Sequence, residues 1–213
     1  MPTNHPHAPR ARLTSGLRPA RWRALAPAAV LALLSVASGG AVAPPALKAG
    51  VFDPPRKAPD FSLQGTDGHV LKFSRYRGKV VLLAFGYSSC PVICPTTLAT
   101  FARAVRELGA ASQGVQVVYI TVDPERDVPE RLKSFVARFD PAFVGGTGTP
   151  AQLAAVRQAY GISAKKIPVG NTYAYAHSSF TYLIDREGRI RALMPYGHPA
   201  DDYVHDLRIL LGE

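Results

Sequence analysis

Two continuous apolar runs constrain the fold of this 213-residue chain more than any other feature. The runs are KVVLLAFGY at 79–87 and VQVVYITVD at 115–123. Such a run is typical of a strand that is buried on both faces, as the strands of parallel sheets are. Between the two runs, apolar side chains recur at helical spacing and predict a helix over 95–109. A strand, a helix and a second strand in this order indicate a layered α/β domain.

The rest of residues 60–213 continues this pattern. A Gly-Thr-Asp-Gly turn predicts a hairpin at 60–73, and a second hairpin is expected at 178–194, turning at Glu187-Gly188. Three more helices are predicted at 128–139, 149–161 and 199–211. Asp127 is the candidate N-cap of the first of these and Thr149 of the second. The element order resembles a thioredoxin fold, with a mixed central sheet flanked by helices and an N-terminal hairpin extension.

The N-terminal part differs in composition from the rest. A basic tail at 1–23 contains five arginines and no acid, and it precedes the uncharged run ALAPAAVLALLSVASGGAVA at 24–43. A basic flank followed by an apolar stretch and small residues is typical of a secretory signal or a membrane anchor. Positive charge before the run keeps the N-terminus cytoplasmic. The domain is therefore expected on the periplasmic side of the inner membrane, or free in the periplasm if the segment is cleaved. The alternative is a disordered Ala/Pro-rich tail.

Residues 44–59 are rich in proline and predict a linker, which leaves 60–213 as the folded domain. The chain has a net charge of +10, but residues 1–50 hold six basic residues and no acid, so much of the charge belongs to the tail. The folded part shows no basic stripe interleaved with aromatic residues. A nucleic-acid partner is therefore not expected.

Both cysteines of the chain lie in one short stretch, YSSCPVICPTT at 87–97. The spacing of Cys90 and Cys94 places both sulfurs on one side of a loop or first helical turn. The N-terminus of the following helix favours thiolate over thiol. In an oxidising compartment such a pair can form a disulfide or bind one metal ion. A purely structural bridge would stabilise the protein only weakly because the loop it closes is short.

The six histidines of the chain are the candidates for a third metal ligand. His5, His7, His69, His198 and His205 lie in the tail, in a turn or around the last helix. His177 stands just ahead of a strongly apolar strand, in YAYAHSSFTYLID. In a thioredoxin arrangement the start of this strand faces the cysteine loop, so His177 is the expected third donor. Two thiolates and one imidazole suit Cu(I), and also Cu(II) if a fourth ligand joins, whereas structural zinc requires four closed ligands.

Three stretches of the chain resemble the Sco/SenC family, which comprises copper-binding thioredoxin-fold proteins that help to build cytochrome c oxidase. FGYSSCPVICPTTL at 85–98 resembles the family's C-x-x-x-C-P motif. YITVDPERDVPERLKSF at 119–135 is similar to its Asp-Pro segment, and AHSSFTYLIDREGRI at 176–190 to its histidine segment. The similarity covers roughly residues 55–213.

The resemblance implies the ligands and the residues around them. Cys90, Cys94 and His177 would bind copper, the two cysteines would also be a redox-active pair, and Asp123 would support the site. Family members often carry an acid between the cysteines and another just before the histidine. This chain has Pro91-Val92-Ile93 and Ala176 at those places, which removes negative charge from around the metal.

The resemblance also implies a function. It indicates a metallochaperone that delivers copper to the binuclear copper site of cytochrome c oxidase subunit II, or reduces the thiols of that site, with other copper or thiol-redox assembly factors as further partners. The alternative is an exported thiol–disulfide oxidoreductase without a copper role. Three residues rather than two between the cysteines argue mildly against it. A thiol peroxidase is the least favoured class, because Arg126 and Arg131 are weakly placed to polarise a peroxide.

Overall fold

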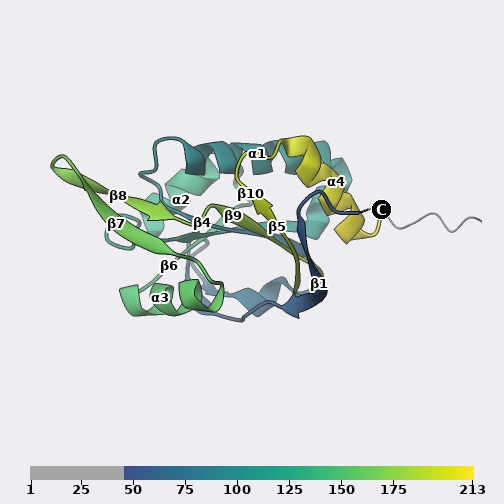
Figure 1. The fold of residues 1–213 in the computed structure, drawn as a ribbon, viewed down its shortest axis with the longest axis horizontal. Coiled ribbons are helices and arrows are strands. Elements are labelled where there is room, and N and C mark those ends of the chain that lie inside the picture. The colour runs from purple at the N-terminus through teal and green to yellow at the C-terminus, as the bar shows by residue number, and fades with distance from the viewer. Residues whose placement is uncertain (1–45) are drawn as a thin grey trace, which may run out of the picture. The chain divides into compact units, whose positions relative to one another are not determined.

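The computed structural model describes residues 46–213, so the segments predicted at 1–23 and 24–43 lie outside the described residues. A single mixed sheet of eight strands forms the centre of the described part, in the order β1-β10-β9-β4-β5-β6-β2-β3 (Figure 1). A separate two-stranded ribbon, β7–β8, projects from it. Among the described helices, none is long and apolar enough to span a bilayer.

The strands are β1 (Gly50–Lys57), β2 (Ser62–Gly65), β3 (Val70–Lys72), β4 (Val80–Gly86), β5 (Val115–Thr121), β6 (Val144–Thr147), β7 (Ala164–Val169), β8 (Thr172–His177), β9 (Phe180–Ile184) and β10 (Arg189–Pro195). β4 pairs in parallel with β5, and β5 with β6, while the other pairings are antiparallel. Every residue of β4 is buried, as expected of a central strand that is covered on both faces. The predicted apolar strands and both predicted hairpins are confirmed.

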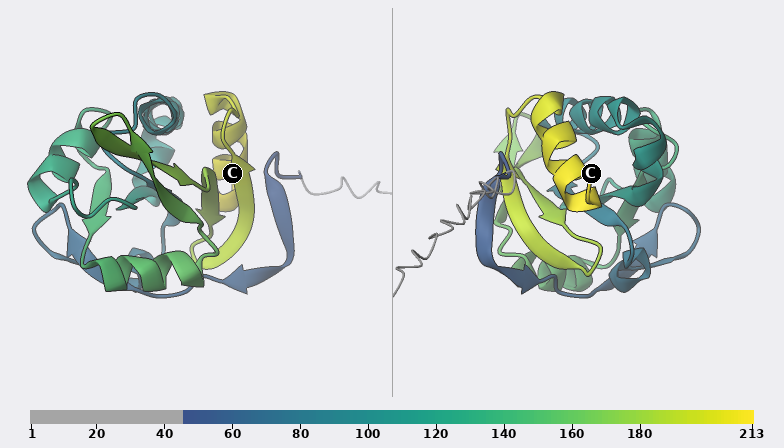
Figure 2. Two further views of the ribbon diagram at one scale, coloured as in Figure 1. Left: turned by 60° about the vertical axis from the view of Figure 1, so that its left-hand side comes forward. Right: turned by 90° about the vertical axis from the view of Figure 1, so that its right-hand side faces the viewer.

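The α-helices are α1 (Ile93–Glu107), α2 (Pro129–Ala137), α3 (Pro150–Ala159) and α4 (Ala200–Leu211). α1 and α4 lie side by side on one face of the sheet, and α3 covers the opposite face (Figure 2). Thr149 caps α3 in the predicted way, because its hydroxyl accepts from the Gln152 N–H and the Gln152 side chain accepts from the Thr149 N–H. This arrangement confirms the predicted thioredoxin-like α/β fold.

The linker prediction for 44–59 is wrong for most of its length. Residues 50–57 form β1, the edge strand that pairs with β10. Prolines are tolerated there because an edge strand has unpaired N–H positions and the register shifts between Val51 and Arg56. The backbone N–H groups of Lys48 and Ala49, just before β1, donate to the buried carboxylate of Asp206 in α4, at 2.7 and 3.0 Å. These contacts fasten the segment to the domain.

The β7–β8 ribbon is the other feature that the sequence pattern missed. Its two strands pair over their full length, from Ala164 opposite His177 to Val169 opposite Thr172. Much of its surface is exposed, so it lacks the apolar runs by which the central strands are recognised. Because β8 ends at His177, the base of this ribbon carries the predicted third metal ligand.

Candidate metal centre

The cysteine loop connects the carboxyl end of β4 to the first turn of α1. Cys94 is the second residue of α1 and only 2% exposed, whereas Cys90 in the loop is partly exposed. No disulfide joins them. The Cys94 N–H points at Cys90 Sγ, 3.5 Å away. The Cys90 sulfur therefore lies against the helix N-terminus, where unpaired backbone N–H groups gather.

The two thiols share one proton unequally. The Cys94 thiol donates to the Cys90 sulfur, and this contact is the main reason why the pKa of Cys90 is lowered to about 5. Backbone N–H groups of Val92, Ile93 and Cys94 lower it further, while burial opposes them. The same contact, together with burial, raises the pKa of Cys94. Cys90 is consequently a thiolate at neutral pH, and Cys94 keeps the proton.

The imidazole of His177 lies on the other side of Cys94. Its Nε2 is 3.8 Å from Cys94 Sγ, and its Nδ1 is 2.8 Å from the Ser178 carbonyl oxygen. A carbonyl can only accept, so Nδ1 carries the hydrogen, and in the neutral ring the Nε2 lone pair faces the sulfur. The ring of Tyr87 packs edge-on against the imidazole, with centroids 5.9 Å apart. The fold thus places both predicted partners, Cys90 and His177, around Cys94.

The separation of the donors fits a shared metal ion. Two ligands of one trigonal ion, bound at about 2.3 Å through sulfur and about 2.0 Å through nitrogen, lie roughly 3.7 Å apart. The distance from Cys94 Sγ to His177 Nε2 is 3.8 Å. Within residues 46–213, no three His, Cys, Asp or Glu side chains are already drawn together as a closed ligand set. The geometry is therefore that of a preformed pair, which Cys90 can complete by a change of its partly exposed side chain.

A buried tyrosine hydroxyl reaches the same place from β5. Tyr119 is 1% exposed, and its hydroxyl has no hydrogen-bond partner. A Cβ added at Gly86 would lie 2.1 Å from this hydroxyl oxygen and 2.7 Å from Cys94 Sγ. Only glycine at the end of β4 thus leaves room for both atoms. The sequence predicts Tyr119 within an apolar strand, and nothing in the local pattern marks its hydroxyl as different.

The Asp123 carboxylate contacts Arg126 and the β7–β8 ribbon rather than the cysteines. It is fully buried, and its carboxylate accepts from Arg126 Nε and from the Tyr173 hydroxyl, the latter at 3.0 Å. Arg126 also donates to the Tyr173 carbonyl oxygen at 3.0 Å and stacks over the Tyr173 ring, 3.9 Å from its centroid. Tyr173 belongs to β8, the strand that ends at His177. The Asp123–Arg126–Tyr173 cluster therefore fastens the His177 ribbon to the domain.

The N-cap prediction for Asp127 is wrong. The N-cap residue of α2 is Val128, and no side chain caps that helix. The Asp127 carboxylate instead turns inward and is fully buried. It accepts from the N–H and hydroxyl of Ser88, the former at 2.9 Å, and from the Thr121 hydroxyl at 2.6 Å. Asp127 therefore holds the loop that leads to Cys90.

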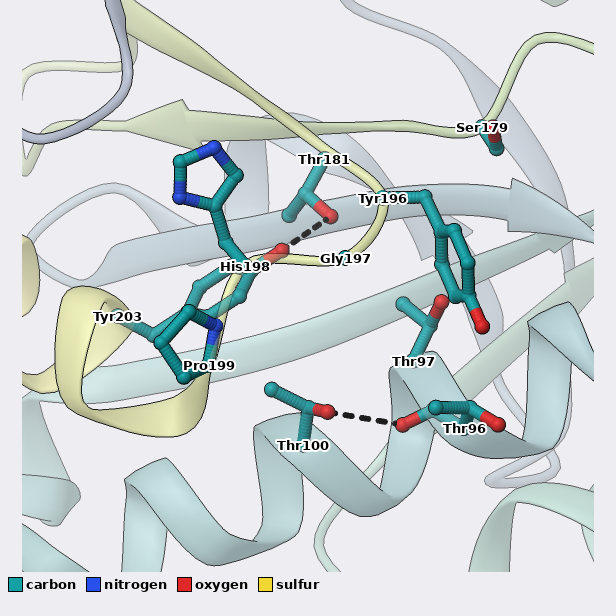
Figure 3. Close-up of a pocket in the computed structure, with 10 residues that line it drawn as sticks. All are labelled: Thr96, Thr97, Thr100, Ser179, Thr181, Tyr196, Gly197, His198, Pro199 and Tyr203. Carbon is teal, nitrogen blue, oxygen red and sulfur yellow. Dashed lines mark hydrogen bonds between the residues drawn. The ribbon is translucent and has the colours of Figure 1, made fainter.

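A cavity of about 330 Å³ lies between α1 and the segment that precedes α4 (Figure 3). Its lining is rich in hydroxyl groups and includes Thr97, Ser179 and Thr181, which also line the small cleft that contains Cys94 and His177. No lysine, arginine or carboxylate lines either space. The walls of the cleft at Cys94 and His177 are therefore polar but uncharged.

Comparison with known proteins identifies the family of this chain. The SCO2-like protein of Rickettsia prowazekii is 38% identical over 132 residues, which cover 61% of this chain and 64% of that protein. The structure of Bradyrhizobium japonicum ScoI with copper bound matches with a TM-score of 0.67 and 33% identity, over 72% of this chain and 99% of that one.

BsSco, described as having a disulfide switch and as a member of the Sco family of cytochrome c oxidase assembly proteins, matches with a TM-score of 0.60 and 25% identity. The match covers 74% of this chain and 95% of that one. The SCO1/SenC family model matches residues 52–212. Since that match covers nearly the whole described domain, the chain belongs to the SCO1/SenC family.

Proposed function

We propose that this protein binds copper through Cys90, Cys94 and His177 and serves the assembly of the binuclear copper site of cytochrome c oxidase subunit II. The observation that carries the proposal is the 3.8 Å separation of Cys94 Sγ and His177 Nε2, beside a Cys90 whose pKa is lowered to about 5. Membership of the SCO1/SenC family and the copper-bound state of the ScoI relative support the choice of metal.

The donor set favours Cu(I). Two thiolates and a neutral imidazole are soft to borderline ligands, which suit a three-coordinate Cu(I) ion. The cleft around Cys94 and His177 is lined by no lysine, arginine or carboxylate. A divalent ion gains more than a monovalent one from nearby carboxylates, so an uncharged surround favours Cu(I) over Cu(II).

Copper is the cargo in this account, and it leaves by ligand exchange. Cys90 is the more exposed of the two sulfurs, so it is the ligand that an acceptor thiolate replaces first. Cys94 and His177 follow as further acceptor ligands bind. No electrons move in this exchange, since one thiolate replaces another at the same ion. Oxidation of Cys90 and Cys94 to a disulfide removes two ligands and two electrons, so it couples copper loading to redox state.

The N-terminal sequence supports a proposed location for this activity. The basic tail and the uncharged run at 24–43 favour an anchor in the inner membrane, with the domain on the periplasmic side, or a cleaved signal. Partners would then be the oxidase subunit and thiol-redox or copper factors of the same compartment.

An anaerobic Cu(I) titration tests the proposal. The reduced full-length protein competes with a chromophoric Cu(I) chelator, and so do the variants His177→Ala and His198→Ala. His198→Ala is the control, because the His198 imidazole pairs with Asp202. The wild type and the control are expected to bind one copper ion, and His177→Ala to bind it at least about tenfold more weakly. Equal affinity of His177→Ala and the wild type would rule out the proposed ligand set.

A thiol–disulfide oxidoreductase is the second candidate, favoured by the lowered pKa of Cys90. Its thiolate would attack a substrate disulfide, the substrate sulfur would leave as a thiolate, and Cys94 would resolve the mixed disulfide. Reduction of insulin or of oxidised subunit II, measured with copper chelated, separates the two functions. Fast turnover without metal would favour the oxidoreductase.

A further inference from the structure

The Tyr119 hydroxyl is a buried polar group that the metal ligands do not account for. It is 1% exposed and has no hydrogen-bond partner. A buried hydroxyl without a partner costs free energy, because the water that it gave up is not replaced. The other buried tyrosine hydroxyls in described residues show the contrast. Tyr160 donates to the Pro59 carbonyl oxygen at 2.8 Å, and Tyr203 lies 3.2 Å from the Thr181 hydroxyl.

The position of this hydroxyl indicates its partner. The hydroxyl oxygen and Cys94 Sγ lie on the same side of Gly86, where a single added Cβ would contact both atoms. Tyr119, Cys94 and His177 line the same small cleft. Gly86 on β4 and Tyr119 on the neighbouring parallel strand β5 therefore both lie next to the Cys94 sulfur.

A neutral thiol is a weak acceptor. A cysteine sulfur that binds a metal ion carries charge and becomes a strong acceptor for an O–H donor beside it. We propose that Tyr119 is a positioning residue whose hydroxyl donates to the Cys94 sulfur once that sulfur binds copper, and so stabilises the copper-loaded form. This inference rests on the proposed function.

The hydrogen bond from Tyr119 stabilises one state of the protein more than the other. A hydrogen bond to a charged group is worth more than one between neutral groups. Removing the hydroxyl therefore weakens Cu(I) binding. It does not loosen the metal-free fold, because the hydroxyl makes no bond there. This combination separates a hydrogen-bond role from a packing role.

Tyr119→Phe in the full-length protein tests the inference, since it removes only the oxygen. The matched control is Tyr160→Phe, which removes a buried hydroxyl that is already bonded, to Pro59. Two measurements apply to both: Cu(I) affinity against a chelator, and the thermal midpoint of the metal-free protein.

Tyr119→Phe is expected to bind Cu(I) about tenfold more weakly. The thermal midpoint of the metal-free variant should be unchanged or higher. Tyr160→Phe should lower the thermal midpoint and leave the Cu(I) affinity alone.

Wild-type Cu(I) affinity in Tyr119→Phe would overturn the inference, and so would a loss of affinity that comes with a lower thermal midpoint. His177→Ala tests the proposed ligand set separately. If His177→Ala binds Cu(I) as the wild type does but Tyr119→Phe binds it more weakly, the ligand set is wrong and the hydrogen bond to Cys94 stands.

Discussion

His177 Nε2 lies 3.8 Å from Cys94 Sγ, although the two residues are 83 positions apart in the chain. The contact depends on the β7–β8 ribbon, whose last residue is His177, and on the α1 N-terminus, which holds Cys94. Neither element alone makes a metal site. Residues that fix the ribbon or the cysteine loop should therefore affect copper binding without touching copper.

The ribbon should loosen when Arg126 loses its charge. Arg126→Gln leaves Asp123 buried without its ion pair, and it removes the guanidinium stacked on Tyr173. Breaking a buried pair costs about 3 kcal/mol of unfolding free energy, which urea denaturation measures. Arg103→Gln is the control: it breaks exposed pairs with Glu107 and Asp201 and should leave the free energy of unfolding almost unchanged.

The same variant should weaken the contribution of His177. In a double-mutant cycle for Cu(I) affinity, His177→Ala should cost less in the Arg126→Gln background than in the wild type, because the ring is no longer held against Cys94. Additive effects would show that the Asp123–Arg126–Tyr173 cluster stabilises the fold without positioning the imidazole.

Asp127 should matter more than a helix cap does. Asp127→Ala leaves the N–H and hydroxyl of Ser88 and the Thr121 hydroxyl without their acceptor. The Thr121 hydroxyl is buried and the Ser88 donors are partly buried. A buried donor left unpaired costs about 1–3 kcal/mol, so the free energy of unfolding should fall by more than about 2 kcal/mol. The loss of an N-cap alone costs only about 1 kcal/mol. A measured loss of about 1 kcal/mol would indicate that Asp127 contributes no more than a helix N-cap does.

Cys90 should react as a thiolate over most of the pH range. Because folding lowers its pKa to about 5, the thiolate forms well below the pH at which an ordinary thiol ionises, and it is lost only as the pH falls through about 5. Alkylation of the reduced, metal-free protein by iodoacetamide should reach a plateau above about pH 6. In Cys94→Ala the inflection should move to higher pH, since the Cys94 thiol is the main cause of the shift. An unmoved inflection would contradict the shared proton.

Gly86 should resist substitution although its φ is ordinary. In Gly86→Ala the new Cβ would lie 2.1 Å from the Tyr119 oxygen and 2.7 Å from Cys94 Sγ. Such overpacking typically costs about 1–3 kcal/mol and should displace Cys94. The Gly86→Ala/Tyr119→Phe double variant should recover part of the stability, because the closest clash is with the hydroxyl. Denaturation of both variants measures this, and no recovery would place the clash elsewhere.

The elements that could be predicted from the sequence are those with a strong local signal. Continuous apolar runs marked β4 and β5, and the helical spacing after the cysteines marked α1. The cysteine pair and His177 stood out because few residue types provide such donors, and the resemblance to Sco/SenC proteins joined them across the chain. These features reflect chemistry that is visible within a few neighbouring residues.

What escaped prediction depends on contacts that are distant in the chain. β1 and the β7–β8 ribbon are largely exposed, so they lack apolar periodicity. Asp127 precedes a helix and resembles a cap, but donors on Ser88 and Thr121 turn its carboxylate inward. The Arg126–Tyr173 contact joins residues 47 apart. No local pattern encodes which partner such a side chain finds.

X-ray absorption at the copper edge of the Cu(I)-loaded protein reports on the ligand set itself. We expect two sulfur scatterers at about 2.3 Å and one nitrogen at about 2.0 Å, with the nitrogen absent from His177→Ala. A wild-type spectrum with sulfur scatterers alone, or a nitrogen that persists in His177→Ala, would contradict it.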